Sequence, residues 1–222
     1  MSLKKVNFFS ELHYSSKRNY LKRMLNDKAY ASDIAKKFGK DYWDGDKKFG
    51  YGGYKYIPNR WGKFAKKLIK KYDLKNSSKI LDIGCGKGFL LADIKNLLPQ
   101  IDVTGYDISS YAKKKAHKDI KKNIFNIRAQ DKYRFKDKQI DLLISLGTLH
   151  NLKIFELEKA FKEINRVSKK SYIWVESYRN SKELFNLQCW ALTCQSFHTP
   201  DEWLWLFKKF NYTGDYEFIF FK

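Results

Sequence analysis

The sequence predicts an α/β protein whose mostly parallel sheet carries helices on both faces. Between residues 61 and 176, short runs rich in β-branched and aromatic residues alternate with segments that repeat apolar residues at helical spacing. Strands that alternate with helices are joined by right-handed crossovers, which leave the strands parallel and both faces of the sheet covered. A chain of 222 residues suits one domain of this kind with a small additional cap.

The predicted strands are short apolar runs that come in a regular order. They are Lys79–Ile83, Asp102–Asp107, Ile124–Ala129, Ile140–Ser145, Tyr172–Glu176 and, last, Tyr216–Phe221. Helices are predicted between and after them, at Trp61–Tyr72, Phe89–Leu98, Ser109–Lys122, Ile154–Ser168, Ser181–Gln195 and Pro200–Phe210. The final strand follows two helical segments and therefore stands apart from the alternating region.

Residues 1–60 differ from the rest and are expected to form a cap over residues 61–222. Tyr14–Phe38 has a helical pattern, whereas Asp41–Arg60 mixes aromatic residues with glycines and shows no clear period. Loops of that composition often contact ligands. The cap residues expected to face a bound substrate are Tyr42, Trp43, Tyr51, Tyr54 and Arg60. An equally weighted alternative is that these aromatic residues pack the helix at Trp61–Tyr72 against the sheet.

The composition limits the partners and the compartment. Lys and Arg total 45 against 24 acidic residues, a net charge of +21 that could attract a nucleic acid. The basic residues are mostly lysine and are spread along the chain, which favours a solvated surface. The apolar stretch Ile140–Leu149 is too short to span a membrane. Three cysteines without a CxxC pair argue against a disulfide framework or a structural zinc site, and no secretory signal follows Lys4 and Lys5, so a reducing cytoplasm is expected.

The most informative stretch is Ile80–Gly88, a buried strand that ends in three alternate glycines and leads into a helix. Glycines there let main-chain N–H groups approach a ligand closely. A nucleoside-triphosphate loop is excluded because Lys87 is followed by glycine and not by Ser or Thr. A dinucleotide loop needs a glycine where Phe89 stands, and Asp82 would oppose its pyrophosphate. An acid beside the loop suits a ligand that carries a cation.

These residues resemble the first motif of class I S-adenosylmethionine-dependent methyltransferases, which is an acidic residue, one spacer and GxGxG. The resemblance covers about Trp61 to Glu176. It implies a Rossmann-like, doubly wound sheet of seven strands whose last strand is antiparallel. It also implies that backbone groups at Gly84 and Gly86 line the methionine end of S-adenosylmethionine, that Asp82 helps to bind its ammonium, and that S-adenosylhomocysteine is the product.

The resemblance also assigns the nucleoside end of the cofactor. Asp107 ends the second strand, where a carboxylate can accept both ribose hydroxyls; the alternative is that it belongs to a helix cap with Ser109 and Ser110. Ile108 would flank the adenine. Where the family often has an acid for the adenine amino group, this chain has Ala129, and Gln130 or Asp131 could substitute. The expected cofactor-binding set is Asp82, Gly84, Cys85, Gly86, Gly88, Asp107, Ile108, Ala129, Gln130 and Leu146.

The methyl acceptor should lie beyond the carboxyl ends of the fourth and fifth strands. His150 follows the fourth strand and could take a proton from a hydroxyl or an amine; alternatively, it only holds the loop. Glu176, Tyr178 and Arg179 follow the fifth strand and could contact the acceptor, with structural ion pairing as the alternative. His150 and Glu176 are the candidate catalytic residues, and no metal is expected.

These observations predict a methyltransferase that acts on a small molecule, with a sugar or sugar-nucleotide hydroxyl as the suggested acceptor. A nucleic-acid methyltransferase is the alternative that the charge favours. Against it, Ser145 is followed by Leu146 and Gly147 in place of the [DNS]PP[YF] stretch of base-amino methyltransferases, and no Pro-Cys pair occurs. A non-catalytic cofactor-binding protein is a further alternative.

Overall fold

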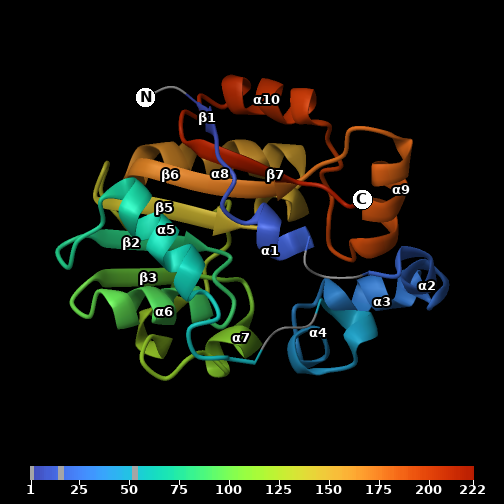
Figure 1. Ribbon diagram of the computed structural model, residues 1–222, viewed down its shortest axis with the longest axis horizontal. Coiled ribbons are helices and arrows are strands. Elements are labelled where there is room, and N and C mark those ends of the chain that lie inside the picture. Colours follow the sequence, from blue (N-terminus) through green and yellow to red (C-terminus); the bar gives the residue numbers. More distant parts are fainter. Residues whose placement is uncertain (1–2, 15–17, 52–54) are drawn as a thin grey trace.

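A computed structural model describes residues 3–14, 18–51 and 55–222 of the chain. Its centre is a seven-stranded sheet in the order β1-β7-β6-β5-β2-β3-β4 (Figure 1). The strands are β1 (Lys4–Lys5), β2 (Lys79–Ile83), β3 (Asp102–Tyr106), β4 (Ile124–Phe125), β5 (Ile140–Leu146), β6 (Ser168–Glu176) and β7 (Asp215–Ile219). The predicted α/β fold with a Rossmann-like sheet is therefore confirmed.

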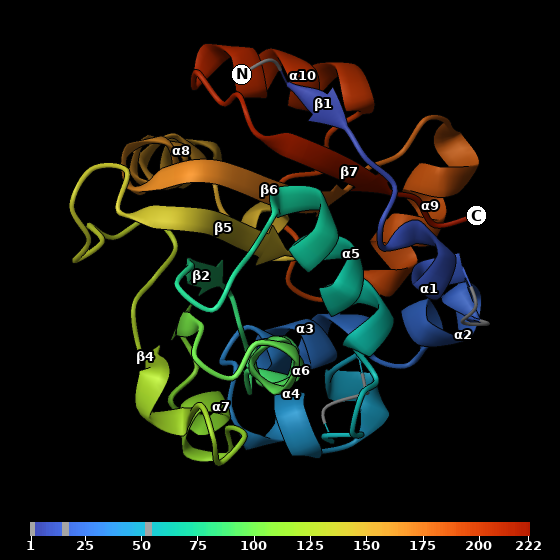
Figure 2. The same cartoon turned by 60° about the vertical axis from the view of Figure 1, so that its left-hand side comes forward.

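Helices cover both faces of this sheet. On one face, α5 (Gly62–Tyr72) and α6 (Phe89–Leu97) bury their apolar sides against β2, β3 and β5. On the other face, α8 (Ile154–Val167) and α10 (Pro200–Lys209) pack in a core that contains alternate side chains of β2, β5, β6 and β7, with α10 lying near β7 (Figures 1 and 2). Side chains of a strand point alternately to its two faces, so these apolar runs can serve two cores at once.

The expectation of an antiparallel last strand is wrong. Every neighbouring pair in the sheet is parallel, including β6 with β7 and β7 with β1. Between β6 and β7 the chain passes through α9 (Ser181–Trp190) and then α10. This helical crossover returns the chain to the amino end of the sheet, so β7 has to run in the same direction as β6.

The amino-terminal residues are fixed by the carboxyl-terminal strand. Lys4 and Lys5 pair with Asp215 and Tyr216. The Glu217 carboxylate, only 1% exposed, accepts hydrogen bonds from the N–H groups of Phe8, Phe9 and Ser10 at 2.8–3.1 Å. These donors lie at the start of α1 (Ser10–Tyr14), where a helix favours a negative charge. Within residues 1–60, the first strand thus joins the sheet itself.

The cap consists of α2 (Tyr20–Leu25), α3 (Lys28–Ala35), α4 (Lys40–Asp44) and the short η1 (Lys47–Phe49). It lies beyond the carboxyl ends of the parallel strands (Figure 1). The predicted helix at Tyr14–Phe38 is divided, because Asp27 has a φ of 46° between α2 and α3. A residue in that left-handed conformation interrupts a right-handed helix.

Other elements are shorter than predicted. The expected helix at Ser109–Lys122 is α7 (Ser110–Lys114), followed later by η2 (Lys121–Asn123). β4 ends at Phe125, and α9 ends at Trp190, well before the predicted Gln195. In the part of the chain that the structure describes, no helix has the length and apolar character that crossing a bilayer requires.

Candidate active site

The glycine-rich loop between β2 and α6 has the backbone that its sequence requires. Gly84, Gly86 and Gly88 have φ angles of 78°, 56° and 73°, a region that side chains disfavour. Space is restricted as well: a Cβ atom on Gly84 would lie 1.8 Å from Thr148 Oγ1, and one on Gly88 would lie 2.0 Å from Ile120 Cδ1. Cys85 turns back from the loop and packs against Gly105 of β3.

Two buried carboxyl groups flank this loop. Asp107 accepts hydrogen bonds from the N–H groups of Gly86 and Ser109, each at 2.7 Å, so it links the loop to the end of β3. Asp82 is also buried, but no described residue hydrogen-bonds to its carboxyl group. Burial and the nearby Asp107 raise the pKa of Asp82 to about 8. A buried acid without a partner fits the ammonium group that the resemblance assigns to this position.

The residues expected around the nucleoside divide into two groups. Ile108, just after β3, is 49% exposed, so its apolar side chain is available to contact the adenine ring. Beside it, Asn126 Nδ2 donates to the Asp107 carbonyl at 3.2 Å. In contrast, the Ala129 carbonyl accepts from Tyr133, and the Gln130 amide donates to Glu156 on α8 at 3.0 Å. The Gln130 side chain is therefore directed toward α8.

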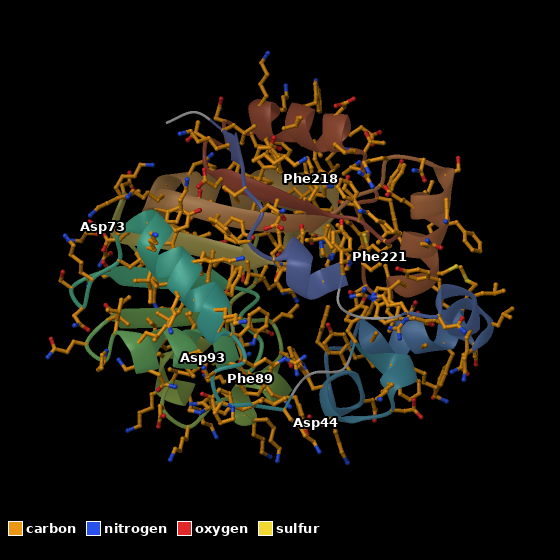
Figure 3. All side chains as sticks on the ribbon, viewed as in Figure 1. Asp44, Asp73, Phe89, Asp93, Phe218 and Phe221 are labelled. Atoms are coloured by element: carbon orange, nitrogen blue, oxygen red, sulfur yellow. The ribbon has the colours of Figure 1, made fainter. Side chains whose placement is uncertain are left out.

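The cap closes over the glycine-rich loop. The Trp43 ring lies directly over Gly86, and its Nε1 donates to Ser109 Oγ at 2.9 Å. Asp44 fixes this end of α4, because it pairs with Lys87 at 2.6 Å and accepts from the Tyr111 hydroxyl at 3.0 Å. Figure 3 shows Asp44 at the edge of the cap, on the side of the region that carries Phe89 and Asp93. Leu146, at the end of β5, is partly buried against the core on the α5–α6 face.

On the acceptor side, His150 and Glu176 lie together as their positions predict. His150 belongs to η3 (Leu149–Asn151), and its Nδ1 accepts from the backbone N–H of Glu176 at 3.2 Å. Nδ1 therefore carries no proton, and Nε2, the protonated nitrogen of the neutral ring, lies 3.4 Å from Glu176 Oε2. Burial lowers the pKa of His150 to about 3 and raises the pKa of Glu176 to about 8. His150 is thus neutral, and its lone pair already accepts a hydrogen bond.

The cap places polar groups over this pair. Tyr51 lies beside the segment after α9, where its hydroxyl accepts from the Leu192 N–H at 2.8 Å and lies 3.3 Å from Thr193 Oγ1. Thr193 in turn donates to Asn151 Oδ1 at 2.8 Å. Lys28 donates to the Cys189 and Ala191 carbonyls. These contacts join the cap, η3 and the segment after α9 into one packed cluster near Glu176, and this cluster of residues is called the acceptor chamber below.

The remaining predicted residues lie at its margins or elsewhere. Tyr42 packs edge-on against Trp43 and Tyr51 and so supports the cap. Tyr178 packs with the apolar cluster around Leu187, and Arg179 pairs with Glu183 while its guanidinium lies 4.2 Å from the centre of the Phe220 ring. Arg60 is exposed at the turn before α5. Tyr54 lies outside the described residues.

Sequence reasoning missed several residues of the chamber. They are Arg18, Lys28, Asn151, Trp174 and Thr193. The period-two pattern of the fifth predicted strand was a usable signal for one of them, because Trp174 and Glu176 must share a face. The cap residues gave no such signal, because their positions depend on tertiary packing. No cluster of three or more potential metal ligands occurs among the described residues.

Comparisons with known proteins agree with this geometry. Residues 74–211 match the family model described as "Methyltransferase domain". A ribosomal RNA small subunit methyltransferase C of Buchnera aphidicola is 35% identical over 89 residues, which cover 39% of this chain and 26% of that relative. The chain thus spans about a quarter of the length of this curated relative.

Solved structures share the fold at low sequence identity. YcgJ of Bacillus subtilis has a TM-score of 0.51 at 18% identity, over 66% of each chain. A geranyl diphosphate C-methyltransferase of Streptomyces coelicolor, solved with S-adenosylhomocysteine, has a TM-score of 0.51 at 15% identity, over 65% of this chain and 55% of that one. The family model covers more than half of the sequence and the fold agrees, so this chain belongs to the S-adenosylmethionine-dependent class I methyltransferases.

Proposed function

We propose that the protein transfers a methyl group from S-adenosylmethionine to a small-molecule acceptor, with a sugar or sugar-nucleotide hydroxyl as the narrower expectation. The enclosure of the acceptor side carries this proposal. Glu176 is only 8% exposed, and the cap residue Tyr51 is hydrogen-bonded to the segment after α9 above it. A detached small molecule can be enclosed in such a chamber, whereas a base within a long polymer would have to displace the cap. The three cysteines suit action in a reducing cytoplasm.

The residues of the cofactor side would hold and orient the ligand. Asp82 would pair with the ammonium group, the Asp107 carboxylate has lone pairs left for the ribose hydroxyls, and Ile108 would contact the adenine. The bound sulfonium supplies an activated methyl group whose transfer is an in-line displacement. The contribution of the protein is alignment and the exclusion of water, and the cap over Gly86 and Glu176 suits that task.

The first test is calorimetric titration of the purified protein with S-adenosylmethionine and with S-adenosylhomocysteine. We expect saturable binding of both at one site per chain. Conversion to S-adenosylhomocysteine in the presence of a metabolite library would then separate an enzyme from a non-catalytic binding protein. Absence of binding to either compound would remove the proposal.

A nucleic-acid acceptor is the second candidate, and three observations favour it. The net charge is +21, and the Buchnera relative is named as a ribosomal RNA methyltransferase. The outer surface of α8 also has a basic hollow of about 400 Å³ lined by Gln130, Lys132, Lys159, Lys162, Glu163 and Arg166. RNA binding that weakens steeply with salt, and that Lys159→Glu with Lys162→Glu reduces together with methyl transfer, would favour this candidate.

A further inference from the structure

Two buried polar atoms on one face of β6 have no hydrogen-bond partner among the described residues. They are Trp174 Nε1, a donor, and Glu176 Oε2, an acceptor when ionised. The two residues are separated by one position on a strand, so their side chains point to the same face. The approach of His150 Nε2 to Oε2 at 3.4 Å lacks hydrogen-bond geometry. Buried groups of this kind are nearly always paired, so each such exception calls for an explanation.

The two atoms belong to the part of the molecule where an acceptor has to bind. Gly84 of the cofactor loop packs against Thr148, and Gly147 packs under the Trp174 ring, where an added Cβ would lie 2.3 Å from the ring. β5 and β6 are neighbours, so these contacts run from the cofactor loop to the acceptor chamber without a break. The donor and the acceptor therefore lie beside the expected path of the methyl group.

We propose, building on the function proposed above, that the methyl acceptor is a hydroxyl compound whose oxygen accepts from Trp174 Nε1 and donates to Glu176 Oε2. A hydroxyl group is both a donor and an acceptor, so it satisfies both atoms at once. An ammonium group only donates, and a neutral amine has a single lone pair, which the attack on the methyl group uses, so either form would leave Trp174 unpaired. A carbon nucleophile would leave both atoms unpaired.

The same contact provides a route for the proton. As an oxygen lone pair forms the new C–O bond, the S–CH₃ bond breaks and its electron pair stays on sulfur. The O–H bond breaks in the same process, and the Glu176 carboxylate takes the proton. Glu176 thereby acts as a general base, while His150 acts as a positioning residue because its Nδ1 holds the Glu176 backbone.

The surroundings of Glu176 suit a base that works near neutral pH. Burial raises its pKa to about 8, and the cations of Arg18 and Lys28 oppose that rise. The other titratable groups that face it are His150, Tyr51 and Cys194. Burial first, and the Glu176 charge second, raise the pKa of Tyr51 and of Cys194. Because His150 is neutral, the rate should follow the ionisation of Glu176 and increase as the pH rises from 7 to 9.

The test uses methyl-¹³C S-adenosylmethionine with matched acceptors, namely phenol with aniline and glucose with glucosamine, together with a low-molecular-mass cell extract. NMR of the product distinguishes O-methyl from N-methyl groups. We expect O-methyl products. We expect Glu176→Gln to lower the rate by about 100-fold or more and to abolish its rise with pH, and Glu176→Asp to restore part of the rate. Trp174→Phe should lower the rate by about 10-fold.

Measurements of cofactor binding and of melting temperature distinguish a loss of catalysis in a variant from a loss of folding. Glu176→Gln and Trp174→Phe should bind S-adenosylhomocysteine like the wild type and should melt no lower, because the first replaces a buried acid by a neutral group of the same size and the second removes an unpaired buried donor. Glu158→Gln and Trp205→Phe, at exposed positions, serve as matched controls. Products methylated only on nitrogen or carbon, or a fully active Glu176→Gln variant, would overturn this inference alone. If the wild type failed to bind the cofactor, or methylated neither the matched acceptors nor any compound of the extract, both this inference and the proposed function would be overturned.

Discussion

The cofactor side and the acceptor side of the site differ in how the chain builds them. On the cofactor side, Asp82, the glycine-rich loop and Asp107 come from two consecutive strands and the turns that follow them. The glycines have positive φ angles, and the Asp107 carboxylate accepts from the backbone N–H groups of Gly86 and Ser109. On the acceptor side, Tyr51, His150 and Glu176 come from the cap, η3 and β6. His150 Nδ1 accepts from the Glu176 N–H, and the Tyr51 hydroxyl accepts from the N–H of Leu192, which is 141 positions away in the sequence. A loop whose backbone conformation requires glycines leaves a recognisable local sequence motif. Residues that tertiary packing brings together from distant segments leave no such motif.

The largest effect should come from the backbone of the cofactor loop. In Gly84→Ala, the added Cβ meets Thr148 Oγ1 and the residue keeps a strained φ of 78°. We expect about 1–3 kcal/mol of lost stability and about 100-fold weaker cofactor binding, measured by thermal melting and calorimetry. Gly39→Ala is the control, because its φ is −88° and nothing lies within 4 Å of the added atom. If both variants behaved alike, the loop backbone would have no special role.

The second effect concerns the charge of Asp82. Its pKa is about 8 in the folded protein against an ordinary 3.8, so the carboxyl is largely protonated at pH 7. Its contribution to the free energy of unfolding therefore falls as the pH rises from about 4 to 8. An arriving ammonium favours the carboxylate, so cofactor binding should release a proton near pH 7.

Calorimetry in buffers of different ionisation enthalpy measures this proton release. Asp82→Asn should abolish the release and weaken cofactor binding by about 10-fold, since one charge-assisted contact is lost. Proton release that persists unchanged in the variant would assign it to another group.

A smaller effect separates the two groups of residues expected around the nucleoside. Ile108→Ala removes apolar surface that is half-exposed and available to adenine, and we expect about 5-fold weaker binding. Gln130→Ala is the matched control, because its amide contacts Glu156 of α8, and it should change the affinity less than about 2-fold. A larger effect for Gln130 than for Ile108 would reverse this assignment.

The smallest effect should come from the contact between the cap and the loop. Asp44→Asn weakens the pairing with Lys87 that holds Trp43 over Gly86, so the cap should open more often. We expect S-adenosylhomocysteine to dissociate about 3-fold faster in stopped-flow tryptophan fluorescence. Asp41→Asn changes an exposed acid of the same helix and should leave the rate unaltered. Equal rates in all three proteins would separate the cap from cofactor release.

The same contrast explains what the sequence could predict. Ile80–Gly88 specifies its strand, its turn and the family, because each glycine meets a local steric requirement. The antiparallel direction expected for β7 is wrong, because it rested on the family pattern alone. The two helices that precede β7 return the chain to the amino end of the sheet and make the strand parallel. The helix at Tyr14–Phe38 was overextended, because nothing in its apolar spacing shows that Asp27 adopts a left-handed conformation. Lys28 and Thr193 reach the chamber only through the fold of the cap and the segment after α9.

Because Glu217 anchors residues 8–10, different parts of the protein can fold only in a certain order during translation. The hydrogen-bond acceptors for Phe8, Phe9 and Ser10 are supplied by β7, more than two hundred residues later in the chain. During translation the glycine-rich loop can form its local contacts early, but the segment leading into the cap gains its anchor only after residues 215–219 have left the ribosome. A nascent chain should therefore order the glycine-rich loop before the segment that leads into the cap is anchored.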